Sequence, residues 1–205
     1  MADNYFKKDD YWNEYINKKI EEDLWIKDYL DYFDGIGKCL DLGCGIGQYS
    51  KEFMSMGYDV ISADISATAL NKVKEFNRSI IKMDMSENFP FEDEEFDLVF
   101  SNLSIHYFSK EETDNIIEEV YRVLKPGGMF VGSVNGLGVY DKIKDTAKQL
   151  EEHFWIDGEK CVRLFNEEDL RYFLRIFKIL KIEQRLTVRF NYKKDNYLFI
   201  AKKEK

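Results

Sequence analysis

The chain has 205 residues, 44% of them hydrophobic and 16% aromatic, which is enough for one packed core without a disulfide or a metal. Its 39 acidic and 30 basic residues give a formal net charge of −9. This charge repels a phosphate backbone and argues against nucleic acid as a partner. An apolar run of about 18 residues, the length that spans a bilayer, does not occur, so we expect no membrane partner.

The N-terminus and the cysteines indicate the compartment. Residues 1–10 mix charged and aromatic side chains and lack the apolar segment of a signal peptide. Cys39, Cys44 and Cys161 have no metal-ligand spacing, and an odd number of cysteines without a leader favours reduced thiols. We therefore expect a cytoplasmic protein that holds no metal.

The first predicted element is a helix. Apolar side chains recur at steps of three and four residues between Trp12 and Leu24, which predicts a helix over residues 10–33 with a break near Asp23. Gly35 then ends it.

Strands and helices alternate after this helix. Strands are predicted over residues 38–42, 58–63, 79–83, 96–101 and 128–134. Helices are predicted between them over residues 47–56, 66–76 and 109–124. Alternation of this kind requires crossover connections and predicts a parallel sheet with helices on both faces.

The C-terminal third is less regular. After a loop at residues 135–138 we predict a charged helix that extends through His153. Asn166 is a good N-cap, with acidic residues in the turn that follows, and predicts a helix to about Phe177. The last two strands are predicted over residues 179–189 and 195–202.

A glycine-rich turn joins the first of these strands to its helix. Gly43, Gly45 and Gly47 follow Asp41 at alternate positions. Glycine is needed where φ is positive, or where a ligand lies directly against the main chain. The next helix would point free backbone N–H groups into the same space, so the turn predicts a nucleotide-like ligand.

The spacing distinguishes between nucleotide ligands. The dinucleotide fingerprint G-x-G-x-x-G needs a third small residue where this chain has Gln48. Asp41 would repel a pyrophosphate and attract a ligand with positive charge. S-adenosylmethionine carries both a sulfonium and an ammonium group, so the turn favours it over NAD.

The order of motifs resembles class I S-adenosylmethionine-dependent methyltransferases of the small-molecule type. The matching segments are residues 41–47, 58–66, 80–85, 96–102 and 119–130. The resemblance implies an α/β, Rossmann-like, seven-stranded and mostly parallel sheet, with helices on both faces and an antiparallel C-terminal strand. It also implies one domain over residues 1–205.

Residues that bind the cofactor are implied by the same resemblance. Asp64 would bind the ribose hydroxyls, while Asp84 and Met85 would meet the adenine. All stand near strand ends and would face one crevice. The implied cofactor-binding residues are Asp41, Gly43, Gly45, Gly47, Asp64, Ile65, Asp84, Met85 and Ser101.

The reaction implied is an SN2 transfer of the methyl group to an O, N, S or C atom, leaving S-adenosylhomocysteine. The sulfonium is already activated, so the protein chiefly aligns the reactants and excludes water. His106, just past the fourth strand, is the candidate general base. The competing interpretation is a histidine that is hydrogen-bonded to the backbone behind the site.

The acceptor pocket is implied to form from an N-terminal helical lid, residues 1–34, and an insertion, residues 135–165. Aromatic side chains make good walls for a small acceptor. The candidate contacts are Tyr11, Tyr107 and Trp155, for which core or lid packing is the competing interpretation.

Three functions remain open at this point. The leading one is a small-molecule methyltransferase that acts as a monomer or homodimer. The second is a protein or peptide methyltransferase, whose acidic groove would attract basic segments. The third is a protein that binds S-adenosylmethionine without catalysis.

Overall fold

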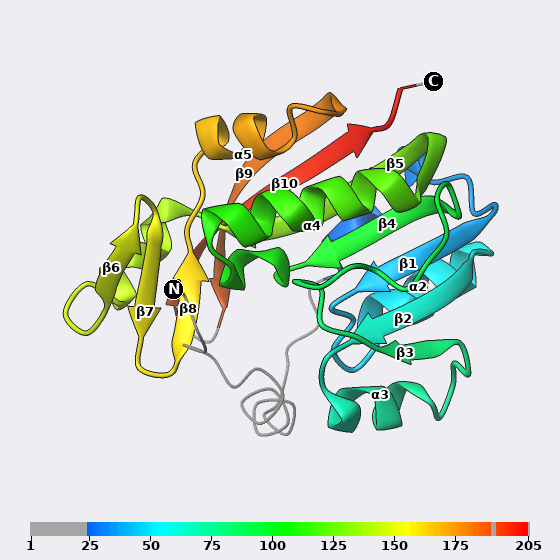
Figure 1. Ribbon diagram of the computed structural model, residues 1–205, viewed down its shortest axis with the longest axis horizontal. Helices are drawn as coiled ribbons and strands as arrows, with labels where there is room; N and C mark the ends of the chain where they lie inside the picture. Colours follow the sequence, from blue (N-terminus) through cyan, green and yellow to red (C-terminus); the bar gives the residue numbers. More distant parts are fainter. Residues whose placement is uncertain (1–23, 190–191, 205) are drawn as a thin grey trace.

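The computed structural model of the chain (Figure 1) describes residues 24–189 and 192–204. Seven strands form one sheet in the order β3-β2-β1-β4-β5-β10-β9. Adjacent strands from β3 to β5 are parallel, whereas β10 runs antiparallel to both β5 and β9. The predicted fold is thereby confirmed. The strands are β1 (Lys38–Leu42), β2 (Asp59–Asp64), β3 (Ile80–Lys82), β4 (Phe96–Asn102), β5 (Leu124–Asn135), β9 (Lys178–Arg189) and β10 (Tyr192–Lys202).

Helices cover both faces of this sheet (Figure 1). One face carries α4 (Lys110–Val123) and α5 (Glu167–Phe173), and the other carries the 3-10 helix η1 (Trp25–Tyr32) and α2 (Gln48–Met56). The helix α3 (Ala67–Val73) packs against β2 and β3. No helix of the described residues is long and apolar enough to cross a bilayer.

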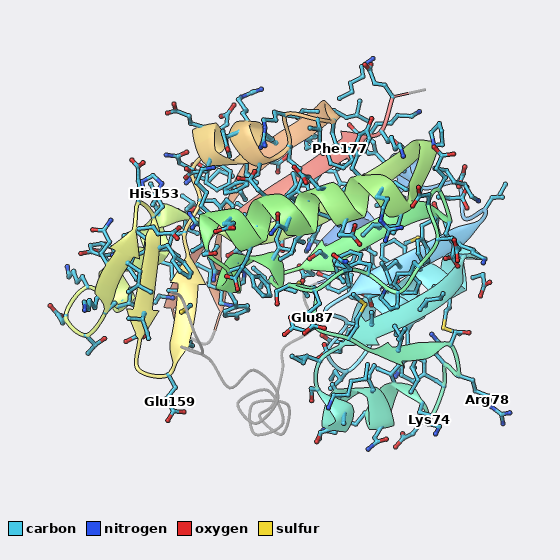
Figure 2. The ribbon with its side chains drawn as sticks, in the orientation of Figure 1. Lys74, Arg78, Glu87, His153, Glu159 and Phe177 are labelled. Carbon is cyan, nitrogen blue, oxygen red and sulfur yellow. The ribbon has the colours of Figure 1, made fainter. Side chains whose placement is uncertain are left out.

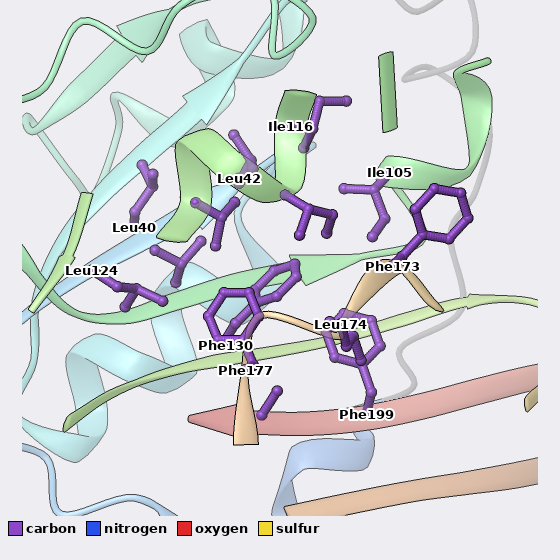
Figure 3. Close-up of a cluster of buried hydrophobic side chains, with 14 of the residues drawn as sticks. Leu40, Leu42, Ile105, Ile116, Leu124, Phe130, Phe173, Leu174, Phe177 and Phe199 are labelled. Carbon is purple, nitrogen blue, oxygen red and sulfur yellow. The ribbon is translucent and has the colours of Figure 1, made fainter. Parts of the chain in front are cut away.

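Alternate residues of β1 face opposite layers, as the two-residue period of a strand requires. Leu40 and Leu42 belong to the cluster under α4 and α5, where they are buried near Ile116 and Phe130 (Figure 3). The opposite face buries Cys39 in a second cluster with side chains from η1 and α2. Polar residues on this second face of β1 are therefore enclosed by helix α2.

The N-terminal helix differs from the prediction over residues 10–33. In the described part of that range the chain forms the 3-10 helix η1, within which Tyr29 departs from helical geometry. The ring of Trp25 lies against Phe100, with their centroids 5.8 Å apart, so η1 covers the second core cluster. The earlier part of the predicted lid, including Tyr11, lies outside the described residues.

The insertion also differs from the prediction, because the expected charged helix through His153 is wrong. The segment forms a 3-10 helix, η3, and an antiparallel three-stranded sheet. Gly158, with φ of +63°, closes the turn between the last two of these strands. The insertion lies beyond the carboxyl ends of β1, β2 and β4 (Figure 1). Its elements are η3 (Leu137–Lys142), β6 (Lys148–Glu151), β7 (Phe154–Asp157) and β8 (Lys160–Arg163).

Arg163 ties this small sheet to the main body. Its buried guanidinium donates from Nε to the carbonyl of Phe108 at 3.1 Å and from Nη2 to Glu151 Oε2 at 2.6 Å. A third bond, of 3.2 Å, runs from Nη1 to the carbonyl of Glu152, and the group lies 5.0 Å from the ring centre of Phe154. The planar fork of arginine is suited to this set of partners.

We therefore expect Arg163→Lys to lower the free energy of unfolding by about 2 kcal/mol, because lysine keeps the charge but leaves buried acceptors unpaired. Urea unfolding would measure the change. The matched control is Arg171→Lys, since Arg171 is exposed and pairs with Glu167, and its effect should stay below about 0.5 kcal/mol. Equal small changes in both variants would contradict this role for Arg163.

Candidate functional site

The glycine-rich turn connects β1 to α2, and its three glycines all have positive φ, of +75°, +53° and +76°. A Cβ added to Gly43 would lie 2.4 Å from the Cβ of Ser104, and one added to Gly47 would lie 2.7 Å from the ring of Phe76. A Cβ on Gly45 would meet no atom of the described residues within 4 Å. Packing within the protein therefore requires two of these glycines, whereas Gly45 faces open space.

Asp64 fixes the position of this open turn. One carboxylate oxygen accepts the N–H of Gly45 at 2.8 Å, and the other accepts the N–H of Ser66 at 2.8 Å. Ser66 in turn caps α3 by accepting the N–H of Ala69. The predicted strand-end acid thus bridges the glycine turn and the start of the next helix. Ile65, which follows Asp64, is half-buried.

Asp41 lies one strand away, paired in register with Ser62 of β2, so the two predicted acids are neighbours. Its side chain is 2% exposed and accepts a hydrogen bond of 2.6 Å from Ser50 of α2. Ser50 also lies 2.8 Å from the Ser62 hydroxyl, which accepts from Asn77 at 3.0 Å. Burial, reinforced by the charge of Asp64, raises the pKa of Asp41 to about 7.

The third predicted acid follows β3. Asp84 accepts the backbone N–H and the hydroxyl of Ser86, at 2.9 and 2.7 Å. Met85 reaches the glycine turn, because its Cε lies 3.2 Å from the Cβ position of Gly43. These residues therefore stand at the same edge of the sheet as the turn.

Ser101 is buried near the end of β4 and hydrogen-bonds to Ser104. The Ser104 hydroxyl donates to the carbonyl of Leu42 at 2.9 Å, so it accepts the hydrogen of Ser101. Ser104 was not singled out from the sequence. The pair ties β4 to the strand that leads into the glycine turn.

His106 lies in the short 3-10 helix η2 (Ile105–Tyr107) and is 1% exposed. Its Nε2 is 3.0 Å from Nδ2 of Asn135, and Nδ1 has no partner among the described residues. Burial, reinforced by the charges of Lys160 and Lys194, lowers the pKa of His106 to about 3. A ring of this pKa is a weak proton acceptor at neutral pH, which does not favour the predicted role as general base. The competing interpretation expects a backbone partner for the imidazole, and none is found in the part of the chain that the structure describes.

The candidate acceptor contacts separate in space. The ring of Tyr107 is half-buried, with its centroid 4.2 Å from that of His106. Trp155 is buried within the insertion, where it packs against Tyr140 at 5.2 Å and against Val162. The structure thus places Tyr107 beside the predicted catalytic region and Trp155 in the core of the insertion.

A second contact holds the insertion to the main body. His153 and Glu159 stand at opposite ends of the insertion (Figure 2). Nδ1 of His153 lies 2.8 Å from a carboxylate oxygen of Asp169, which belongs to the capping box of α5. Across the described residues, no group of three or more His, Cys, Asp or Glu side chains could hold a metal ion.

Comparison with known proteins identifies the class. Residues 40–132 match the family model described as a methyltransferase domain. A solved structure of a SAM-dependent methyltransferase from Methanosarcina mazei aligns with a TM-score of 0.74 at 24% identity, covering 90% of this chain and 99% of that one. Residues 40–132 thus form a methyltransferase domain, and the chain has the fold of S-adenosylmethionine-dependent methyltransferases.

The related proteins are named for different reactions. The sterol 4-C-methyltransferase of Caenorhabditis elegans is 31% identical over 154 residues, which are 67% of this chain and 42% of that protein. The malonyl-[acyl-carrier protein] O-methyltransferase of Buchnera aphidicola is 41% identical over 96 residues, 46% of this chain and 38% of its own length. The human mitochondrial arginine-hydroxylase NDUFAF5 is 32% identical over 134 residues, which are 63% of this chain and 36% of that protein. The chain thus spans less than half the length of these relatives.

Proposed function

We propose that the chain transfers a methyl group from S-adenosylmethionine to a small organic acceptor by SN2 displacement. The observation that supports this proposal is the open space beside Gly45. Asp64 holds the backbone of Gly45 in position at the carboxyl edge of the sheet. A ligand can lie against this backbone because no side chain of residues 24–189 and 192–204 occupies the position. The residues present therefore fit the cofactor that the family uses.

Each cofactor residue has a role in this proposal. A carboxylate oxygen has two lone pairs, so Asp64 can bind the backbone and a ribose hydroxyl together. Asp84 accepts the adenine amine, and Met85 packs against the ring. Asp41 supplies negative charge next to a cationic ligand. The bound cofactor supplies a methyl group on positively charged sulfur, and the protein aligns the acceptor with it and excludes water.

The acceptor side of the proposal rests on the insertion, residues 135–165, which lies beyond the carboxyl ends of the parallel strands (Figure 1). We propose that the insertion and residues 1–34 enclose the acceptor, with Tyr107 beside it. The names of the sterol and malonyl relatives support a small acyl or lipid-like acceptor. The relative named as a hydroxylase shows why the reaction itself must be measured.

A cytoplasmic location is part of the same proposal. Cys39, Cys44 and Cys161 form no disulfide within the described residues, and the first and last are buried. Cysteines that form no disulfide are typical of proteins in a reducing compartment.

We expect S-adenosylhomocysteine at about 100 times its Kd to stabilise the protein by about 2.7 kcal/mol, which raises Tm by roughly 5 to 10 °C. NAD should give no shift, and isothermal titration calorimetry would check both ligands. Release of S-adenosylhomocysteine in a panel of small acceptors, and separately with basic peptides, would then distinguish the two classes of acceptor. Binding without release would leave a cofactor-binding protein, and absence of binding would refute the proposal.

A further inference from the structure

Four polar side chains from four separate elements lie near one another beyond the ends of β4 and β5. They are His106 of η2, Asn135 of β5, Lys160 of β8 and Lys194 of β10. Two of them carry positive charge, although the chain as a whole carries a net charge of −9. The mechanism proposed above uses none of the four.

The pairing of β5 with β10 brings Lys194 to this place. Asn196 is in register with Asn135, the last residue of β5, so Lys194 lies two residues beyond the end of that strand. The N–H of Gly136 donates to the carbonyl of Asp195 at 2.7 Å and extends the contact past the strand end. The position of Lys194 is therefore set by the sheet itself.

The insertion brings Lys160 to the same place. Strand β8 packs against η2, and its last residue, Arg163, donates to the carbonyl of Phe108, just past η2. Further along, the N–H of Phe165 donates to the carbonyl of Asn135 at 2.9 Å. Lys160 is half-buried and has no ion pair within the described residues.

His106 presents an unsatisfied nitrogen among these groups. An amide nitrogen can only donate, so Nε2 of His106 accepts from Nδ2 of Asn135 and the ring proton sits on Nδ1. This Nδ1–H group is buried and has no partner in the described part of the chain. A buried donor without an acceptor is destabilising, which indicates that a ligand supplies the acceptor.

The electrostatics around this donor favour an anion. The charges of Lys160 and Lys194 both reach the imidazole and oppose its protonation. The nearby carboxylate of Asp195 is already engaged, because it accepts the N–H of Gly138 and the side-chain amide of Gln184, each at 2.8 Å. A carboxylate placed here would accept from Nδ1–H and would be attracted by the positive charge of Lys160, which has no ion pair within the described residues.

We propose that His106, Lys160 and Lys194 form a binding site for a carboxylate group of the methyl acceptor, with Asn135 holding the imidazole in the donor tautomer. This inference rests on the proposed function. S-adenosylmethionine also has a carboxylate, but β5 and β10 lie two and three strands beyond β1, about 10 to 15 Å from the strand that leads into the cofactor turn. The acceptor is therefore the source to which we assign the anion.

The chain has two histidines, so selective nitrogen-15 labelling gives two imidazoles to follow by NMR. With the full chain saturated with S-adenosylhomocysteine, we expect succinate to shift the ring nitrogens of His106 in a saturable way, and neutral succinamide to have no effect. His153, which pairs with Asp169, serves as the internal reference. Lys160→Gln and Lys194→Gln should each weaken succinate binding at least about tenfold.

Lys148→Gln is the matched control, since Lys148 is an exposed lysine of the same insertion, and it should leave succinate binding unchanged. Unchanged His106 signals would overturn the inference, as would an equal loss in Lys148→Gln. Competition between succinate and S-adenosylhomocysteine would assign the anion site to the cofactor and overturn it too. If S-adenosylhomocysteine does not bind, the proposed function fails, while the succinate titration can still be read on the ligand-free protein.

Discussion

Replacing Gly45 by leucine should weaken S-adenosylmethionine binding at least about 100-fold and leave the protein folded. The reason lies in the space around the three turn glycines. Within the described part of the chain, a Cβ at Gly45 meets no atom within 4 Å, so a side chain there would displace the ligand rather than parts of the protein. The left-handed backbone at φ of +53° adds about 1–2 kcal/mol of strain. Calorimetric titration and thermal unfolding of the same preparations would separate the two effects.

Gly158→Leu is the matched control for this substitution. Gly158 has φ of +63°, and a Cβ there would also have no neighbour within 4 Å among the residues that the structure describes, but Gly158 lies in the turn between β7 and β8. The control should show the same modest loss of stability and the cofactor affinity of the unsubstituted protein. Gly43→Ala should behave in the opposite way, unfolding more easily because its Cβ would overlap Ser104 at 2.4 Å. Tight binding by the Gly45 variant would show that the cofactor lies elsewhere.

The parallel part of the fold could be predicted because most of its strands are short apolar runs that end at a turn residue or an acid. Residues 38–42 and 58–63 show this pattern, and the observed strands differ from the prediction by a residue or less at each end. The helices between them have local start signals, such as Ser66 before α3. Sequence-local information was therefore sufficient for these units.

The insertion could not be predicted in the same way, because its strands are short and its charged residues resemble an exposed helix. Only three consecutive apolar residues, 154–156, mark β7, and the informative signal was the Asp157-Gly158 pair, with which the hairpin turn begins. This signal was missed. Tertiary pairing between β7 and β8 then decides the structure.

The candidate site shows the same division. Asp41, Gly45 and Asp64 belong to one β-α-β unit, so their convergence follows from the topology of parallel strands. Asn135 and Lys194 are far apart in the sequence and meet only because β10 runs antiparallel to β5. No local pattern marks such residues. The sequence also does not show which of the three turn glycines packs against the protein and which faces open space, because this depends on their neighbours in the fold.

Asp41 should make the stability of the ligand-free protein depend on pH. Burial raises its pKa from an ordinary 3.8 to about 7 in the folded state, so the folded protein holds this proton more tightly than the unfolded chain does. The resulting stabilisation is fully present below about pH 4 and is lost as the pH rises through about 7. A shift of about 3 units corresponds to a loss of about 4 kcal/mol across this window. The buried carboxylate is thus a destabilising feature above neutral pH.

Asp41→Asn should therefore raise the free energy of unfolding at pH 8 by several kcal/mol and remove the slope between pH 5 and 7, since the amide can still accept from Ser50. Its cofactor affinity should fall, because the ionised carboxylate is what attracts a sulfonium ligand. In the unsubstituted protein that affinity should rise from pH 6 to pH 8, whereas the variant should show no such rise. Urea unfolding and calorimetric titration at both pH values measure these changes, and Asp59→Asn, at the exposed start of β2, is the control with no expected effect. If the stability of Asp41→Asn and Asp59→Asn varied with pH in the same way, Asp41 would not be the source of the pH dependence. If Asp41→Asn were more stable but bound the cofactor poorly, the site would retain a charge that favours binding at the expense of stability.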